Sequence, residues 1–165
     1  MTATASFTTC PDAADFPATP PAPDTLMYSL TLPAAAVSAA IARAAARVVL
    51  DTHGLRALTD PALQVVSELT TAACRFTASD EVYLSLRYRD NALRVILYDG
   101  HPRHTHPRLA AACDARRRSA LRLLACVVRA CDGDWGFGDA REPGGGTRMW
   151  AVLPHAGATA YGARP

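Results

Sequence analysis

The sequence predicts an α+β protein, a two-layer sandwich with helices on one face of a mixed, mostly antiparallel sheet. Two patterns support this fold class. Apolar and polar residues alternate, as in half-buried strands, in the segments 26–32, 82–88, 93–97 and 148–153. Apolar residues recur at helical spacing in the segments 34–50, 61–76 and 116–131. Because strands and helices do not alternate regularly along the chain, the order favours helices gathered on one face of a sheet.

The 165 residues are enough for one domain with a substantial core. Residues 1–24 hold five of the twelve prolines, so we predict a disordered leader there. We expect the folded domain over residues 25–155 and a flexible tail over 156–165.

The first predicted strand, 26–32, ends at Pro33, and a helix follows over 34–50. One apolar stripe runs along this helix. The stripe consists of Val37, Ile41, Ala44 and Val48. His53-Gly54 is predicted to end the helical region.

The second helix begins at Asp60-Pro61, a favourable N-cap followed by proline at the first helical position. It is predicted to bury Leu63, Val66, Leu69 and Ala73. A hairpin follows with Asp90-Asn91 as its turn. Residues 99–108 are predicted to form a loop.

The helix over 116–131 is predicted to turn three apolar side chains toward the core. They are Leu121, Leu124 and Val128. The last strand is predicted over 148–153.

Composition restricts the function. No apolar run reaches the roughly 18–20 residues that span a bilayer, so we expect no membrane association. The chain shows no secretory signal, and its five cysteines form no C-x-x-C pair, which favours a reduced, cytoplasmic protein. The net charge of +2 is too small to indicate nucleic-acid binding by itself.

Two clusters allow more than one interpretation. His101, His104 and His106 match no closed zinc pattern, so the sequence predicts no metal site and ordinary loop histidines. The run Arg116–Arg118 could bind phosphate through its guanidinium groups or form a solvated basic helix start, and both alternatives stay open.

Three short motifs occur in a suggestive order. The helix segment 68–76 reads Glu-Leu-Thr-Thr-Ala-Ala-Cys-Arg-Phe, the segment 98–102 reads Tyr-Asp-Gly-His-Pro, and the segment 146–150 reads Gly-Thr-Arg-Met-Trp. With these motifs, residues 26–154 resemble the bacterial anti-sigma-factor serine kinases. That group belongs to the ATPase superfamily of gyrase, heat-shock chaperones and histidine kinases, which share the Bergerat fold.

The resemblance implies an ATP site with magnesium. It implies that Glu68 acts as the base or orients the attacking hydroxyl, and that Asp99 contacts adenine with Gly100 beside it in the cofactor site. It also implies that Thr147 makes a second contact on the adenine side. The segment 116–121 stands where the family has its glycine-rich phosphate loop, and Arg118 would supply a phosphate contact there.

The chain departs from the family in two places. Ala72 stands where an asparagine would hold magnesium, so no metal ligand is expected there, and the segment 116–121 contains no glycine. Lost contacts of this kind lower nucleotide affinity by roughly two to three orders of magnitude.

We therefore expect a regulatory protein that binds a sigma factor or its antagonist, with the helix pair 34–50 and 62–76 as the binding surface. The alternative is an active serine kinase that phosphorylates such an antagonist. Whether the chain forms a homodimer stays open.

Overall fold

The computed structural model describes residues 20–140 and 145–163. Of the leader predicted over residues 1–24, residues 1–19 therefore lie outside the described residues. Its last residues are ordered, because a 3₁₀ helix spans Pro23–Thr25 and the His53 Nδ1 atom lies 2.6 Å from the Ala22 carbonyl oxygen, within hydrogen-bonding distance.

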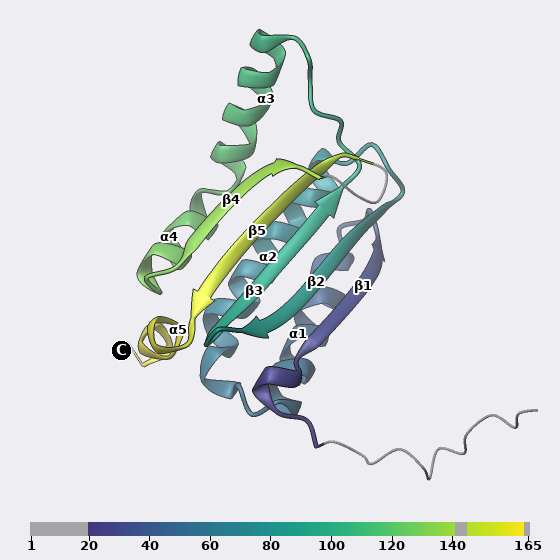
Figure 1. Ribbon diagram of the computed structural model, residues 1–165. Helices are drawn as coiled ribbons and strands as arrows, with labels where there is room; N and C mark the ends of the chain where they lie inside the picture. The colour runs from purple at the N-terminus through teal and green to yellow at the C-terminus, as the bar shows by residue number, and fades with distance from the viewer. Residues whose placement is uncertain (1–19, 141–144, 164–165) are drawn as a thin grey trace, which may run out of the picture.

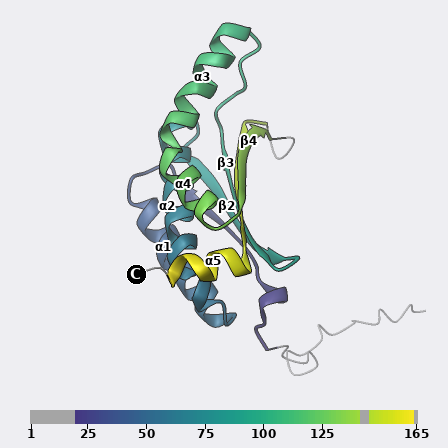
Figure 2. The same ribbon diagram turned by 90° about the vertical axis from the view of Figure 1, so that its left-hand side faces the viewer.

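The predicted α+β fold class is confirmed. Five strands form one sheet in the order β1-β2-β3-β5-β4, and all helices but one cover one of its faces (Figure 1, Figure 2). All pairings among the described strands are antiparallel. The sheet was predicted to be mixed and mostly antiparallel, and the described part has no parallel pair. The strands are β1 (Met27–Pro33), β2 (Glu81–Arg89), β3 (Ala92–Asp99), β4 (Asp134–Asp139) and β5 (Thr147–Pro154).

The hairpin turn at Asp90-Asn91 is confirmed. Both residues have left-handed backbone conformations, with φ values of 55° and 56°. This geometry belongs to the tight two-residue turns that match the twist of paired strands.

Strand β4 was not predicted, and its sequence explains why. DWGFGD contains Gly136 and Gly138, and glycine weakens both strand propensity and the alternating pattern. A Cβ atom at position 136 would press against the ring of Trp150, so the glycine leaves room for this side chain. The strand is specified by its partner β5 rather than by its own pattern.

The helices are α1 (Ser38–Thr52), α2 (Thr59–Phe76), α3 (Pro107–Ala120), α4 (Arg122–Ala130) and α5 (His155–Gly162). Helix α2 buries Leu63, Val66, Leu69 and Ala73 as predicted. Gly54 follows α1 with φ of +71°, in agreement with the predicted helix end. No helix of the described residues is long and apolar enough to cross a membrane.

The apolar stripe identified in the sequence lies on the exposed face of α1. Val37, Ile41 and Val48 are 59%, 45% and 64% exposed, and Ala44 is exposed as well. The buried face of α1 consists instead of Ser38, Ala39, Ala42, Ala46, Val49 and Leu50. Helix α1 is apolar on two faces, and its small alanines let it approach α2 closely, so periodicity alone does not decide which face is buried.

The segment predicted as a helix over 116–131 belongs to two helices, α3 and α4, which meet at Leu121. Leu121, Leu124 and Val128 are buried as predicted. Helix α3 begins at Pro107, a favourable first helical residue, so the predicted loop is shorter than expected.

The predicted flexible tail is also wrong for its described part. Helix α5 packs against α2 and α4 and buries Ala158 completely. A Cβ atom at Gly157 would overlap the carbonyl group of Cys131, so glycine permits this close approach. The segment has a weak helical pattern, and its order depends on this docking.

Candidate functional site

The polar centre of the fold is an ion pair between Asp99 and Arg117. Asp99 ends strand β3, and Arg117 lies on helix α3. The two side chains are 0% and 1% exposed, and the Arg117 Nη1 atom donates to the Asp99 Oδ2 atom at 2.7 Å. The Asp99 Oδ1 atom accepts the backbone N–H of His101 at 2.9 Å. Both carboxylate oxygens are therefore engaged within the chain.

The Arg117 guanidinium group otherwise contacts an aromatic ring and a thioether. Its central carbon is 4.5 Å from the ring centre of Phe76, and its Nη1 atom is 3.1 Å from the Met149 sulfur. The Nε and Nη2 atoms are buried without a hydrogen-bond partner among the described residues. A cation over an aromatic ring gains some electrostatic energy, which partly offsets the loss of water.

Thr147 lies directly opposite Asp99 in the pairing of β3 with β5. It is fully buried, and its Oγ1 atom donates to the His101 carbonyl oxygen at 3.0 Å. The preceding Gly146 has φ of +98°, and a Cβ atom there would overlap the Asp99 carbonyl group. The structure therefore brings Asp99 and Thr147 together, but inside the core.

Gly100 continues the chain beyond Asp99, and its N–H donates to the Thr77 Oγ1 atom at 3.0 Å. A surface cleft runs past this point. Its lining includes Thr31, Ser79, Tyr83, Tyr98 and Gly145 together with Asp99 and Gly100. Neither Glu68 nor Thr147 lines this cleft, so it does not unite the predicted site residues.

Glu68 and Ala72 lie on α2, one turn apart. Ala72 is buried in the hydrophobic core, whereas Glu68 is half-buried. Desolvation raises the pKa of Glu68 above its usual range. No hydrogen bond or ion pair within the described residues joins Glu68 to another group, so the predicted base stands apart from Asp99.

The arginine run divides between the core and the surface. Arg118, predicted as a phosphate contact, is exposed and lies 5.4 Å from the ring centre of Phe137. Arg117 is the arginine that pairs with Asp99, and the sequence analysis did not predict this ion pair. A signal was present, because Arg117 lies one turn before Leu121, which was predicted to face inward.

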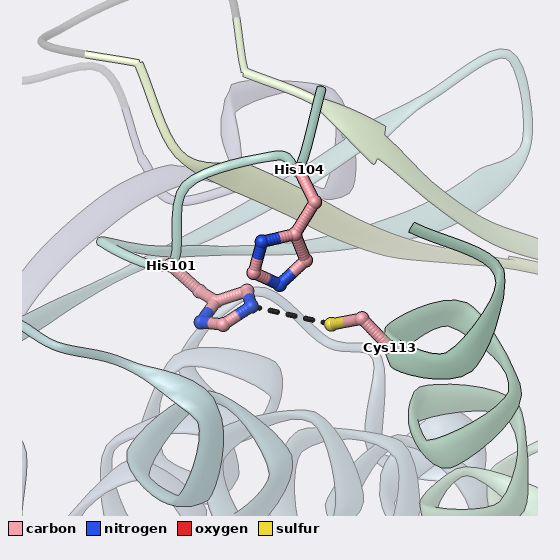
Figure 3. A group of neighbouring side chains, drawn as sticks. All are labelled: His101, His104 and Cys113. Atoms are coloured by element: carbon pink, nitrogen blue, oxygen red, sulfur yellow. Dashed lines mark hydrogen bonds between the residues drawn. The ribbon is translucent and has the colours of Figure 1, made fainter. Parts of the chain in front are cut away.

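A second polar cluster adjoins the ion pair (Figure 3). His101 and His104 come from the loop after β3, and Cys113 comes from α3. The His101 Nε2 atom lies 3.2 Å from the Cys113 sulfur, and one ligating atom from each of the three side chains lies within 4.8 Å of the others. Burial lowers the pKa of His101, and the charge of Arg117 lowers it further, which favours a neutral imidazole.

Arg103 holds this loop in place. Its guanidinium group contacts Asp114 on α3 and Asp139 at the end of β4, each at 2.7 Å. Because Arg103 stands between His101 and His104, these contacts fix the loop beside α3.

A scan against protein-family models finds no match for this chain, and a search of curated proteins finds none either. What the chain does is therefore inferred from its own residues. The carboxylate of Asp99 already accepts a hydrogen bond from Arg117. Beside it lie the imidazoles of His101 and His104 and the thiol of Cys113.

Proposed function

We propose that this chain is a regulatory protein that acts by binding another protein and has lost efficient nucleotide binding. Its sequence motifs resemble those of the anti-sigma-factor serine kinases, so the proposed partner is a sigma factor or the antagonist of one. The observation that carries this proposal is the buried ion pair of Arg117 with Asp99. Asp99 is the residue that the resemblance assigns to adenine.

The ion pair opposes nucleotide binding energetically. Asp99 could accept the amine of adenine only if Arg117 moved away or shared the carboxylate. Breaking a buried pair costs about 3–5 kcal/mol, which corresponds to roughly two to four orders of magnitude in affinity. The absence of a magnesium ligand at Ala72 adds to this loss.

The exposed apolar stripe of α1 supports a protein partner. Val37, Ile41, Ala44 and Val48 follow one another at spacings of three and four residues, so they form a continuous line along the outer face of the helix. Contiguous exposed apolar surface commonly marks an interaction site.

A groove lies between the N-terminal end of α1, with the segment 34–36 before it, and the C-terminal end of α2. It is lined by Ala34, Ala35, Ala36, Ala39, Thr71, Cys74 and Arg75. An apolar line of this spacing fits an amphipathic helix of the partner. The stripe and the groove belong to the segments 34–50 and 62–76, which the sequence analysis proposes as the binding surface.

Loss of nucleotide binding is tested by thermal unfolding with and without millimolar ATP and magnesium. We expect no change in the midpoint, because a weakened site stays largely empty. A ligand at a hundred times its Kd would add about 2.7 kcal/mol and raise the midpoint by several degrees. A magnesium-dependent rise of that size would contradict the proposal.

The partner surface is tested with purified sigma factors and antagonist proteins in a direct binding assay. The double variant Ile41→Glu, Val48→Glu should weaken binding by at least about tenfold. The matched control is Leu123→Glu, because Leu123 is 50% exposed on α4, away from the stripe. Equal affinity of the double variant and the control would exclude α1 as the binding surface.

One observation favours the alternative function of an active serine kinase. The raised pKa of Glu68 suits a general base. This alternative requires phosphate transfer to a serine of the antagonist, and the transfer should be lost in Glu68→Gln.

A further inference from the structure

The cluster of His101, His104 and Cys113 has no role in the proposed regulatory function. Its residues come from two segments that only the fold brings together, the loop after β3 and helix α3 (Figure 3). All three side chains are half-buried, so they are shielded and yet reachable from solvent. Two imidazoles and a thiol form a typical ligand set for Zn²⁺.

The distances fit a tetrahedral ion after a small adjustment. Zinc bonds of about 2.0–2.3 Å place neighbouring ligand atoms about 3.3–3.6 Å apart. The His101 Nε2 and Cys113 Sγ atoms are already 3.2 Å apart, and all three ligating atoms lie within 4.8 Å. A modest rotation of the His104 or Cys113 side chain would complete three ligand positions.

The surroundings hold the ligands in place. The backbone of His101 is fixed from both sides, by Asp99 at its N–H and by Thr147 at its carbonyl oxygen. Arg103 ties the loop to Asp114, the neighbour of Cys113 on α3. Supporting contacts of this kind orient metal ligands.

We propose that His101, His104 and Cys113 form a Zn²⁺ site that fastens helix α3 to the loop after β3. The Cys113 thiol releases its proton to solvent when its sulfur binds the ion, and both imidazoles bind as neutral ligands. The fourth position is left to a water molecule or to a ligand from a bound partner.

The chemistry of the ligands excludes harder ions. Magnesium and calcium prefer oxygen ligands, and this cluster offers one sulfur and two nitrogens. The competing interpretation is a thiol–imidazole hydrogen bond without any ion. That interpretation predicts no selective uptake of metal.

The site is tested by titrating chelator-stripped, reduced full-length protein with Co²⁺, a spectroscopic substitute for Zn²⁺. We expect one equivalent to produce a thiolate-to-cobalt absorption band, which Zn²⁺ then abolishes by displacement. The band should be absent in Cys113→Ser and present in Cys126→Ser, because Cys126 is exposed on α4 and lies outside the cluster. No band in the unaltered protein, or an equal band in Cys113→Ser, would overturn the proposal.

A second variant tests the histidine ligand His104, so that the evidence for the site does not depend on the Cys113 thiol alone. His104→Asn should lower Zn²⁺ affinity by at least about a hundredfold in competition with a chromophoric chelator. The control is His106→Asn, which alters an exposed histidine of the same loop outside the cluster. Equal affinities in these two variants would exclude His104 as a ligand, and melting of the metal-free proteins verifies that both are folded.

Limited proteolysis tests separately whether Zn²⁺ holds α3 in place. Helix α3 carries Arg108, Arg116 and Arg118 on its exposed surface, where trypsin can cleave once the helix opens. Zn²⁺ should slow cleavage at these sites in the unaltered chain and leave the rate unchanged in Cys113→Ser. Equal rates with and without Zn²⁺ in the unaltered chain would show that the ion does not fasten α3.

Discussion

Arg117 differs from the arginines on either side of it because of its angular position on the helix. Consecutive residues on a helix point about 100° apart, so one member of a run of three can face inward while its neighbours face water. The inward position is tolerable because Asp99 neutralises the charge and Phe76 covers the guanidinium plane. The same pair removes Asp99 from the surface, where it was expected to contact a nucleotide.

Replacing Arg117 with methionine should destabilise the protein strongly. Arg117→Met leaves the Asp99 carboxylate buried without its partner, and we expect a loss of about 3–5 kcal/mol in the free energy of unfolding. Urea denaturation measures this loss. The matched control is Arg118→Met, where an exposed residue changes and the effect should stay within about 0.5 kcal/mol.

If Arg117→Met and Arg118→Met lowered the free energy of unfolding by the same small amount, the buried ion pair would not stabilise the fold as inferred. The double variant Asp99→Asn, Arg117→Met gives a further check. It removes both charges, so it should be more stable than Arg117→Met alone.

Glu68 gives a pH-dependent prediction. Its pKa is raised in the folded state, so the native protein binds this proton more tightly than the unfolded chain does. The resulting stabilisation is present below the unfolded pKa and is lost as pH rises through the folded pKa. At pH 7, Glu68→Gln should therefore be as stable as the original protein or more stable, by about a few tenths of a kcal/mol because the side chain is only half-buried.

This advantage should vanish near pH 4, where the glutamate is largely protonated in both states. Urea denaturation at the two pH values measures the difference. Glu81→Gln, at an exposed position on β2, provides the control. A stability gain for Glu68→Gln that grows as the pH falls would contradict the direction of the shift.

At the scale of elements, helices α1 and α5 show how partners determine orientation and order. Helix α1 is apolar on two sides, and it buries the side with small residues because α2 then fits closely against it. Helix α5 has a weak pattern and is ordered because it docks against α2, the 3₁₀ helix Arg56–Leu58, α4 and the end of β5. Neither outcome follows from hydrophobic periodicity within the element itself.

The docking of α5 can be tested with two glycines of the same helix. Gly157→Ala should cost about 1–3 kcal/mol, because the new methyl group would overlap the Cys131 carbonyl. Gly162→Ala meets its nearest atom at ordinary contact distance, so it should be neutral or slightly stabilising through helix propensity. Chemical denaturation of the two variants makes the comparison, and equal stabilities would show that α5 does not dock as described.

At the scale of the whole molecule, α3 projects beyond the sandwich while the other helices cover the sheet (Figure 1, Figure 2). Arg117 is the buried residue of this helix. Polar contacts join the helix to the end of β3 and to the loop after it, through Arg117, Asp114 and Cys113. Helix α2, in contrast, lies at the centre of the core. We infer that α3 opens locally without unfolding of the domain.

Hydrogen exchange should show this difference directly. In metal-free protein, the amides of α3 should exchange roughly tenfold or more faster than those of α2. Mass spectrometry of proteolytic fragments resolves the two helices. Equal protection of α3 and α2 would mean that the projecting helix is as tightly held as the core.

The amino-acid sequence by itself determined the fold class, most element boundaries, the Asp90-Asn91 turn and the inward faces of α2 and α4. These features depend on interactions close in the chain, such as alternation, helical spacing and turn chemistry, and one sequence contains them fully.

Only the tertiary structure decided the rest. The glycine-rich β4, the order of α5 and the buried side of α1 depend on which neighbours cover them. The pairing of Arg117 with Asp99 and the meeting of His101 with Cys113 join residues 18 and 12 positions apart through the packing of α3. Such contacts are set by free energy summed over packed partners, and no local pattern records that sum.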